Sequence, residues 1–423
     1  MSVNKIRIIL FITWIFFVSS PSFSQIHLEV TPGLSISETY DDNIYLESTD
    51  KTSDYITAVS PSINFLLTSR SNHLGLQLAP TFVWYEEEKQ NDTIRHSGTL
   101  SFGQELSQNL RFDFSNAYSR SEDPIEEGEV GEFDRDTRDL FWRNSTHSTL
   151  QYHFGPENTF SLGYDIALLE NEDITLDDNR TRNYSADMTY WFNTENGMEI
   201  HYGYMEAEFF RDDDNTPGDH YTGSSTSARY NHRFSSHTTG LISYGLTRRS
   251  FAGTTENYNV HDGSIGLDTD FAQNFSLSFA GGYFVQENEQ SNDVSGYTYH
   301  GSLTKQFEHG SLSIGGSGGW NESYLGVERR GFTRYWAINM DTEYQIADSL
   351  NIHAGGSYRH NRDFRNREWW NWSGNCGLAW AFSNWSSLSL DYSHHEAMDD
   401  VGMAEYQDNR VVLSISASRL FRW

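Results

Sequence analysis

Residues 160–168, Phe-Ser-Leu-Gly-Tyr-Asp-Ile-Ala-Leu, alternate between large apolar side chains and small or polar ones. The apolar positions are Phe160, Leu162, Tyr164, Ile166 and Leu168. Successive side chains of a β-strand point to opposite faces, so a period of two predicts a strand with one apolar face and one polar face. Such a strand lies between two different solvents.

The same alternation recurs along the chain, at Leu74, Leu76, Leu78, Phe82 and Trp84, at Phe275, Leu277, Phe279, Tyr283 and Val285, and at Leu388, Leu390 and Tyr392. Nine compact polar turns at nearly regular spacing separate pairs of such segments. They lie at residues 69–72, 107–109, 155–158, 193–197, 235–238, 272–274, 308–310, 347–349 and 383–386. Each interval between turns therefore holds two strands and one further connection.

Those further connections are longer and often acidic, as at residues 41–54, 122–136, 171–178, 212–219 and 398–405. Short turns on one side and long loops on the other are typical of bacterial outer-membrane barrels, whereas a soluble sandwich has no reason to segregate its loops. A propeller also repeats at this spacing, but its strands are shorter and no blade signature recurs. The nine short turns and the two chain ends together define ten hairpins. Ten hairpins predict an all-β fold, a transmembrane antiparallel β-barrel of about 20 strands (18–20).

Composition excludes a helical membrane protein. The chain has 423 residues, 37% hydrophobic side chains and a mean hydropathy of −0.63, and each spanning helix would need about 20 consecutive apolar residues. The aromatic share of 15% is too high for a disordered chain. An ordered strand protein remains.

The first 24 residues have the features of a secretory signal peptide. Lys5 and Arg7 precede an apolar run at residues 8–18, and Ser22-Phe23-Ser24 offers a small-x-small cleavage pattern. We expect cleavage near Ser24 and Gln25, export through the Sec pathway to the bacterial outer membrane, and one barrel domain over residues 25–423. The alternative is that this segment stays uncleaved as a membrane anchor, but its apolar run is short for a helix that spans a membrane.

The formal net charge is −30 at pH 7, which argues against nucleic acid as a partner. Such a surplus favours cations, or it serves only the solubility of long exposed loops. The single cysteine, Cys376, cannot form an intrachain disulfide.

The last predicted strand carries apolar residues on one parity, at Val411, Leu413, Ile415 and Ala417, and this parity continues to Phe421 and Trp423. Arg419 interrupts it. An open sheet edge in hydrocarbon leaves costly unpaired backbone groups, so this strand is expected to pair with the first one. The pattern resembles the terminal signal that the outer-membrane barrel assembly machinery reads, with Phe421 and Trp423 as its aromatic positions.

Residues 35–45, Ser-Ile-Ser-Glu-Thr-Tyr-Asp-Asp-Asn-Ile-Tyr, followed by Ala-Val-Ser-Pro-Ser-Ile at 58–63, resemble the opening hairpin of the β-barrel porin 2 family. The resemblance covers roughly the first forty residues after the signal peptide, with the aromatic terminus in support. It implies an outer-membrane barrel associated with exopolysaccharide biosynthesis and export. It implies no established catalytic residues.

The polar parity of the strands provides candidate pore-lining residues. They are Gln77, Arg111, Asp113, Asp165, Glu199, His201 and Asp391. A lining of mixed charged and polar residues suits a hydrated pore or a path for sugars. The alternative is that these residues only keep the barrel lumen hydrated.

The acidic loops provide candidate lid residues. Asp41, Asp42 and Asn43 could coordinate Ca²⁺, or they could make turns through side-chain hydrogen bonds. Residues 122–136, with Glu126, Glu127 and Glu129, could form a lid over the mouth or a solvated external loop.

The sequence contains no nucleophile motif, no HExxH and no phosphate loop, so we expect neither an enzyme nor a cofactor or metal centre. The leading hypothesis is a conduit for exopolysaccharide export. The alternatives are a general or cation-preferring diffusion porin and a structural or adhesive surface barrel. Expected partners are outer-membrane lipid and lipopolysaccharide, the assembly machinery, exopolysaccharide and periplasmic export components.

Overall fold

The computed structural model describes residues 26–123, 138–173, 176–210, 220–253, 255–272, 274–323, 331–363, 366–400 and 405–423. Within these ranges one antiparallel sheet contains twenty long strands and a two-residue strand, and one short 3-10 helix lies in the connection between two of them. They are β1 (His27–Asp41), β2 (Asp54–Thr68), β3 (Asn72–Tyr85), η1 (Lys89–Asn91), β4 (Thr93–Glu105), β5 (Leu110–Ser121), β6 (Phe141–His153), β7 (Thr159–Asn171), β8 (Asp178–Trp191), β9 (Asn196–Phe210), β10 (Tyr221–Ser235), β11 (Thr238–Phe251), β12 (Tyr258–Ala272), β13 (Phe275–Asn288), β14 (Val294–Gln306), β15 (Gly310–Ser323), β16 (Gly331–Ala347), β17 (Leu350–Asp363), β18 (Glu368–Ser383), β19 (Ser386–Asp399), β20 (Tyr406–Ser418) and β21 (Phe421–Arg422). The described residues include no helix that is long and apolar enough to cross a membrane.

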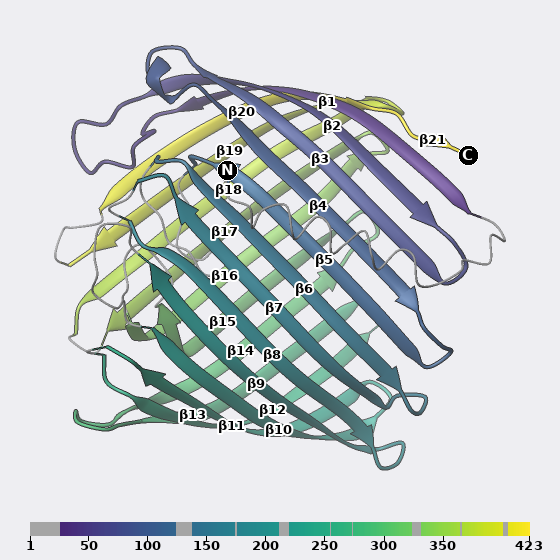
Figure 1. Cartoon of the computed structure of the whole chain (residues 1–423), viewed down its shortest axis with the longest axis vertical. Coiled ribbons are helices and arrows are strands. Elements are labelled where there is room, and N and C mark those ends of the chain that lie inside the picture. The colour runs from purple at the N-terminus through teal and green to yellow at the C-terminus, as the bar shows by residue number, and fades with distance from the viewer. Residues whose placement is uncertain are drawn as a thin grey trace.

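The sheet closes on itself. Each strand pairs with its neighbours in the chain, and β1 pairs with both β2 and β20, from Gly33 opposite Ser418 to Asp41 opposite Arg410. Figure 1 shows the tilted strands wrapping round the barrel until β20 lies beside β1. The expected barrel of about 20 strands and the expected pairing of its first and last strands are confirmed.

The two faces of the sheet differ as the alternation predicts. Large apolar side chains on one parity are exposed, such as Ile265 at 67% and Phe279 at 56%, and they form the outer surface. The opposite parity holds the small and polar residues, and near the loop end it holds buried ones such as Val260 and Phe284. A sheet that is apolar outside and polar inside fits a lipid exterior and a hydrated lumen.

The connections alternate in length as expected. The nine turns from β2–β3 to β18–β19 are short, and the ten connections at the other end include the acidic segments. In barrels of this class the short turns face the periplasm and the long loops face the outside. We therefore call the loop end the outer mouth.

Proline marks the two irregular places in the wall near the first strands. Pro61 of β2 stands opposite Pro80 of β3, and the pairing between these strands is interrupted from Ser60 to Ser62 because neither proline has an N–H to donate. The terminal strand was expected to run on to Trp423. It instead breaks after Ser418, where Pro32 of β1 accepts a hydrogen bond from the Arg419 N–H, and resumes as β21.

Candidate functional site

The seven residues predicted to line a pore all lie on the inward parity. Gln77 of β3 pairs with Asn64, Asp113 of β5 with Gly103, and Glu199 of β9 with Arg229, each within the inner face. Arg111, Asp165, His201 and Asp391 share that parity on their strands. Their role in passage of a solute stays a prediction.

Three of these residues belong to histidine–aspartate pairs on the inner wall. His147 of β6 contacts Asp165 of β7 through Nδ1. His201 Nδ1 lies 2.6 Å from Asp187 Oδ1 on β8, and His353 Nε2 of β17 lies 3.5 Å from Asp391 Oδ1. One member of each pair was predicted from the sequence as pore-lining, whereas His147, Asp187 and His353 were not. The first two could have been found, because a short turn between neighbouring strands fixes which residues face each other.

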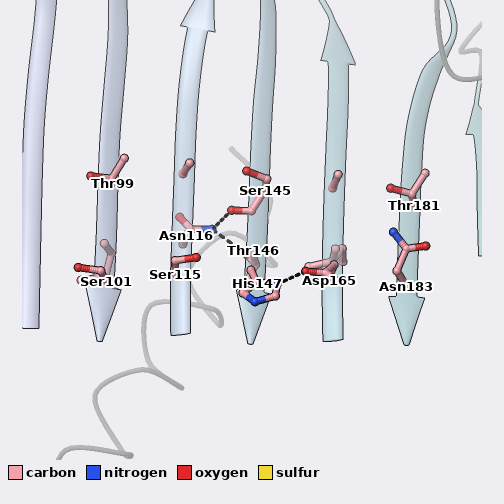
Figure 2. A pocket seen from close by; sticks show the side chains of 14 residues that line it. Thr99, Ser101, Ser115, Asn116, Ser145, Thr146, His147, Asp165, Thr181 and Asn183 are labelled. Atoms are coloured by element: carbon pink, nitrogen blue, oxygen red, sulfur yellow. Dashed lines mark hydrogen bonds and ion pairs between the residues drawn. The ribbon is translucent and has the colours of Figure 1, made fainter. Parts of the chain in front are cut away.

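A depression of about 400 Å³ lies in the inner wall around the first of these pairs. Figure 2 shows its hydroxyl, amide and imidazole side chains on neighbouring strands, with His147 joined to Asp165. Thr149 Oγ1 lies 2.7 Å from Nε2 of the same histidine. The labelled side chains on the inward parity are Thr99, Ser101, Ser115, Ser145, His147, Asp165, Thr181 and Asn183, whereas Asn116 and Thr146 share the parity of the exposed outer residues Tyr118 and Tyr152. Such a lining offers many donors and acceptors and little fixed charge.

At the outer mouth, buried and half-buried ion pairs join β1, β4 and β20 to both ends of the β5–β6 connection. We call this set of residues the mouth cluster: Asp41, Tyr85, Arg95, Glu122, Asp123, Arg138, Asp408 and Arg410. Arg95 lies 2.6 Å from Glu122 Oε1 and 2.6 Å from Asp123 Oδ2. On the other side of Asp123, Arg138 Nη1 lies 3.0 Å from Asp123 Oδ1.

Arg138 also ties this connection to the first and last strands. Its Nη2 lies 3.2 Å from Asp41 Oδ2, and Arg410 Nε of β20 lies 3.1 Å from the same oxygen. Arg138 Nη1 also donates to Tyr85 Oη at 2.9 Å. The Arg138 and Asp41 side chains are 3% and 1% exposed, so the charges compensate one another away from water.

The first loop folds against this cluster, and its Asx residues make turns. Asp41 Oδ1 accepts the Asn43 N–H at 2.9 Å, and Asn43 Oδ1 accepts the Glu47 N–H at 2.9 Å. Asp42 accepts hydrogen bonds from the backbone and side chain of Asn409. These side-chain hydrogen bonds are the turn contacts that were one of the two alternatives predicted for Asp41, Asp42 and Asn43. One carboxylate oxygen each of Asp41, Asp42 and Asp408 also lies within 4.8 Å of the others, and Arg138 and Arg410 supply positive charge there.

The predicted lid is described only at its ends. Glu122, Asp123 and Arg138 enter the mouth cluster, whereas Glu126, Glu127 and Glu129 lie outside the described residues, as does the predicted signal peptide, residues 1–24. The ends alone show that this connection is anchored on the inner side of the wall.

Low pH should weaken the ion pairs that Asp123 makes at one end of the β5–β6 connection. Burial alone would raise the pKa of Asp123, but Arg95, Arg138 and Arg410 outweigh it and hold the pKa below its usual value. The stabilisation is present above the unfolded pKa of an aspartate, about 3.9, and is lost as the pH falls through the lower folded value. We expect added acid-active protease to cut the β5–β6 connection faster below about pH 4 than at pH 5. A cleavage rate that does not change between these pH values would contradict the anchoring.

Elsewhere at the outer mouth, the described end of β15 and the described start of β16 bend into the lumen. We call residues 319–323 and 331–335 the inward hairpin. Pairing between β14 and β15 ends at Tyr299 and Gly318, whereas β15 and β16 stay paired to Ser323 and Gly331. Glycines 315, 316, 318 and 319 lie where the strand leaves the wall. Gly319 has a φ of +156°, which favours glycine.

Side-chain contacts give the direction of this bend. Phe332 shares the parity of lipid-facing Trp336 and Ile338, yet its ring centroid lies 5.8 Å from Tyr258 and 6.0 Å from Phe284. Both partners belong to the inner face of β12 and β13. The lipid-parity face of the inward hairpin therefore packs against the inner wall.

A polar contact fixes the same hairpin. Glu322 Oε2 lies 2.7 Å from Arg249 Nη2 of β11, and Glu322 Oε1 accepts a hydrogen bond from Tyr258 Oη at 2.6 Å. The Arg249 and Glu322 side chains are 10% and 15% exposed. The mouth cluster and the inward hairpin thus both place side chains on the inner side of the wall at the outer mouth.

Comparisons with known proteins concern the fold. The solved structures that resemble this chain include the FrpB iron transporter from Neisseria meningitidis (F5-1 variant), with 9% identity, a TM-score of 0.56 and coverage of 92% of this chain and 82% of that one. The siderophore receptor PirA from Acinetobacter baumannii shares 9% identity with a TM-score of 0.53, covering 95% and 81%. The copper transporter OprC shares 8% identity with a TM-score of 0.54, covering 95% and 81%. No protein-family model and no curated protein sequence matches the chain.

The closed sheet, its apolar outer face and its segregated loops decide the location. The chain is a barrel of the bacterial outer membrane. Lipid and lipopolysaccharide are therefore its surroundings. Membership of the β-barrel porin 2 family stays a prediction from residues 35–63, and the assembly role of Phe421 and Trp423 stays one as well.

Proposed function

We propose that this barrel is a cation-preferring diffusion channel for small hydrophilic solutes, narrowed at its outer mouth. The observation that carries the proposal is the inner wall, which is polar along the strands beneath the mouth cluster and the inward hairpin. Passage through such a barrel needs a hydrated lumen and a selective lining. The polar side chains of the inner wall would keep the lumen hydrated, and its charged side chains would make it selective.

The charges of the wall support a preference for cations. Arginine neutralises two of the predicted pore-lining carboxylates, since Arg111 lies 2.7 Å from Asp113 and Arg229 lies 3.5 Å from Glu199. Asp165, Asp187 and Asp391 instead face histidines, which lack the permanent charge of arginine. A surplus of carboxylate along a narrow path attracts cations and repels anions.

The preference can be measured as a reversal potential under a salt gradient. We expect the wild-type barrel in a planar bilayer to favour cations, and we expect the triple variant Asp165→Asn, Asp187→Asn, Asp391→Asn to lose most of that preference while it still conducts. A matched control is Glu308→Gln, which removes one exposed acid in a periplasmic turn. Anion preference in the wild type, or an unchanged reversal potential in the triple variant, would count against the proposal.

Export of exopolysaccharide is the second candidate, and the inner-wall depression favours it. Hydroxyl, amide and imidazole groups around a space of about 400 Å³ could make weak repeated contacts with sugar hydroxyls. Polymer from the producing strain should then interrupt the current of single channels, and Asn183→Leu should shorten those interruptions. Current that polymer leaves unchanged would favour the diffusion channel. If neither the wild-type barrel nor a variant that lacks Arg138 and Phe332 carried any current, a structural or adhesive role would be favoured.

A further inference from the structure

The histidine–aspartate pairs of the inner wall each contain one group whose charge changes near neutral pH. We call them the wall pairs: His147 with Asp165, His201 with Asp187, and His353 with Asp391. The three histidine side chains are 55%, 42% and 45% exposed. Water in the lumen therefore reaches every ring and can exchange protons with it.

The wall pairs lie on two opposite parts of the barrel. The first two occupy the adjacent strands β6 to β9, and the third joins β17 to β19. Because the closed sheet has twenty long strands, β8 and β18 are ten strands apart and face each other across the lumen. An ion that passes through the barrel therefore has wall pairs on both sides.

The surroundings of His147 leave Asp165 as the carboxylate that governs its pair. Ser115 stands opposite His147 on β5, and Asp165 stands opposite it on β7. Asp113, which is diagonal to His147 on β5, is held by Arg111 at 2.7 Å. The charge of Asp165 has no arginine of this kind.

The surroundings of His201 are similar. Asp187 stands opposite it on β8, and Ser227 stands opposite it on β10. Arg229 is diagonal to His201 on β10, and its Nη1 lies 3.5 Å from Glu199. The guanidinium is thus shared with another acid, and the charge of Asp187 faces the imidazole.

His353 has acidic residues on both sides. Glu343 stands opposite it on β16, with Asp341 diagonal to it, and Asp391 reaches it from β19 across Gly377 of β18. A Cβ on Gly377 would lie 2.2 Å from Asp391 Oδ1 and 2.4 Å from His353 Cε1. The missing side chain at Gly377 therefore makes room for this pair.

We propose that the wall pairs make the cation preference of the barrel depend on pH, so that mild acid removes most of it. The inference rests on the proposed diffusion channel and adds its regulation. An imidazole gains a proton between about pH 8 and about pH 5, whereas an aspartate keeps its charge there. A pair with a neutral ring carries the charge of its aspartate, and a pair with a protonated ring carries no net charge. The two opposite walls thus lose their negative charge together, and with it their attraction for cations.

The test is the reversal potential of the refolded full chain in a planar bilayer under a salt gradient, at about pH 8 and at about pH 5. Both values lie above the acid range in which Asp123 should lose its ion pairs. We expect the wild-type reversal potential to favour cations at the higher pH and to move toward zero at the lower pH.

Two triple variants separate the wall pairs from other histidines. The first is His147→Gln, His201→Gln, His353→Gln. It should keep the wild-type reversal potential at the higher pH and lose most of the shift, the remainder coming from other inward rings such as His73 and His300. The matched control removes three histidines of the lipid-facing parity and should keep the full shift: His96→Gln, His261→Gln, His360→Gln.

A third variant tests the pairs even if the first fails to fold. Asp165→Asn, Asp187→Asn, Asp391→Asn keeps the rings without their carboxylates, so it should turn to anion preference at the lower pH. A wild-type cation preference that is the same at both pH values, a full shift in the folded histidine variant, or an aspartate variant without any shift would overturn the inference and leave the proposed function standing. Absence of cation preference at the higher pH would instead contradict the proposed function.

Discussion

Replacing Arg138 with alanine is expected to raise the single-channel conductance several-fold. Arg138 is 3% exposed and contacts Asp41, Asp123 and Tyr85. Its loss leaves Asp41 with Arg410 alone and frees the end of the β5–β6 connection from the first strand. Removing one member of a buried ion pair costs about 3–5 kcal/mol. The Arg138 end of the connection should therefore lose its attachment to the inner side of the wall.

A matched control for this variant is Arg422→Ala. Arg422 also pairs with a carboxylate, Glu29, at 2.8 Å, but its side chain is 70% exposed near the periplasmic end. Exposed pairs contribute about 0–1 kcal/mol. Conductance should then match the wild type. A conductance of Arg138→Ala equal to that of Arg422→Ala would show that the mouth cluster does not limit the current.

Phe332→Ala is expected to release the inward hairpin. The ring packs among Tyr258, Phe284 and Trp320, with a stacked Trp320 centroid 5.7 Å away. Truncation of a buried phenylalanine costs about 3–5 kcal/mol. Because the barrel below is held by its strand pairing, we expect the loss to appear as a mobile hairpin and longer open times rather than as unfolding.

Spin labels at the hairpin would report this release directly. A nitroxide on Asn321→Cys, an exposed position next to Glu322, in a Cys376→Ser background, should gain mobility in the Phe332→Ala protein. Phe279→Ala provides the control, since Phe279 is 56% exposed on the lipid-facing side. Equal label mobility in all three proteins would mean that aromatic packing does not hold the hairpin.

The strands of the barrel wall could be predicted because side-chain alternation and pairing across short turns depend only on residues close in sequence. The alternation from Phe160 to Leu168 assigns lipid and lumen faces to β7, and a short turn then fixes the partner of each residue. The pairing of His147 with Asp165 follows from the turn between β6 and β7. Closure of β1 on β20 followed from the cost of an open edge in lipid.

The mouth could not be predicted because it depends on the closed barrel. Arg138 and Asp41 are 97 residues apart, and Arg410 reaches the same carboxylate only after the last strand has joined the first. Periodicity contains no information on such contacts. The inward hairpin did leave a signal in the Gly-Gly-Ser-Gly-Gly run at residues 315–319, since glycines inside a strand mark bends or close approaches.

The most direct test is a single-channel recording of the refolded wild-type barrel, and of the double variant Arg138→Ala, Phe332→Ala, in a planar bilayer under a salt gradient. The account predicts small cation-selective steps for the wild type and larger steps with weaker blockage for the double variant. Identical steps in both proteins, or no current in either, would contradict a hydrated channel narrowed at its outer mouth.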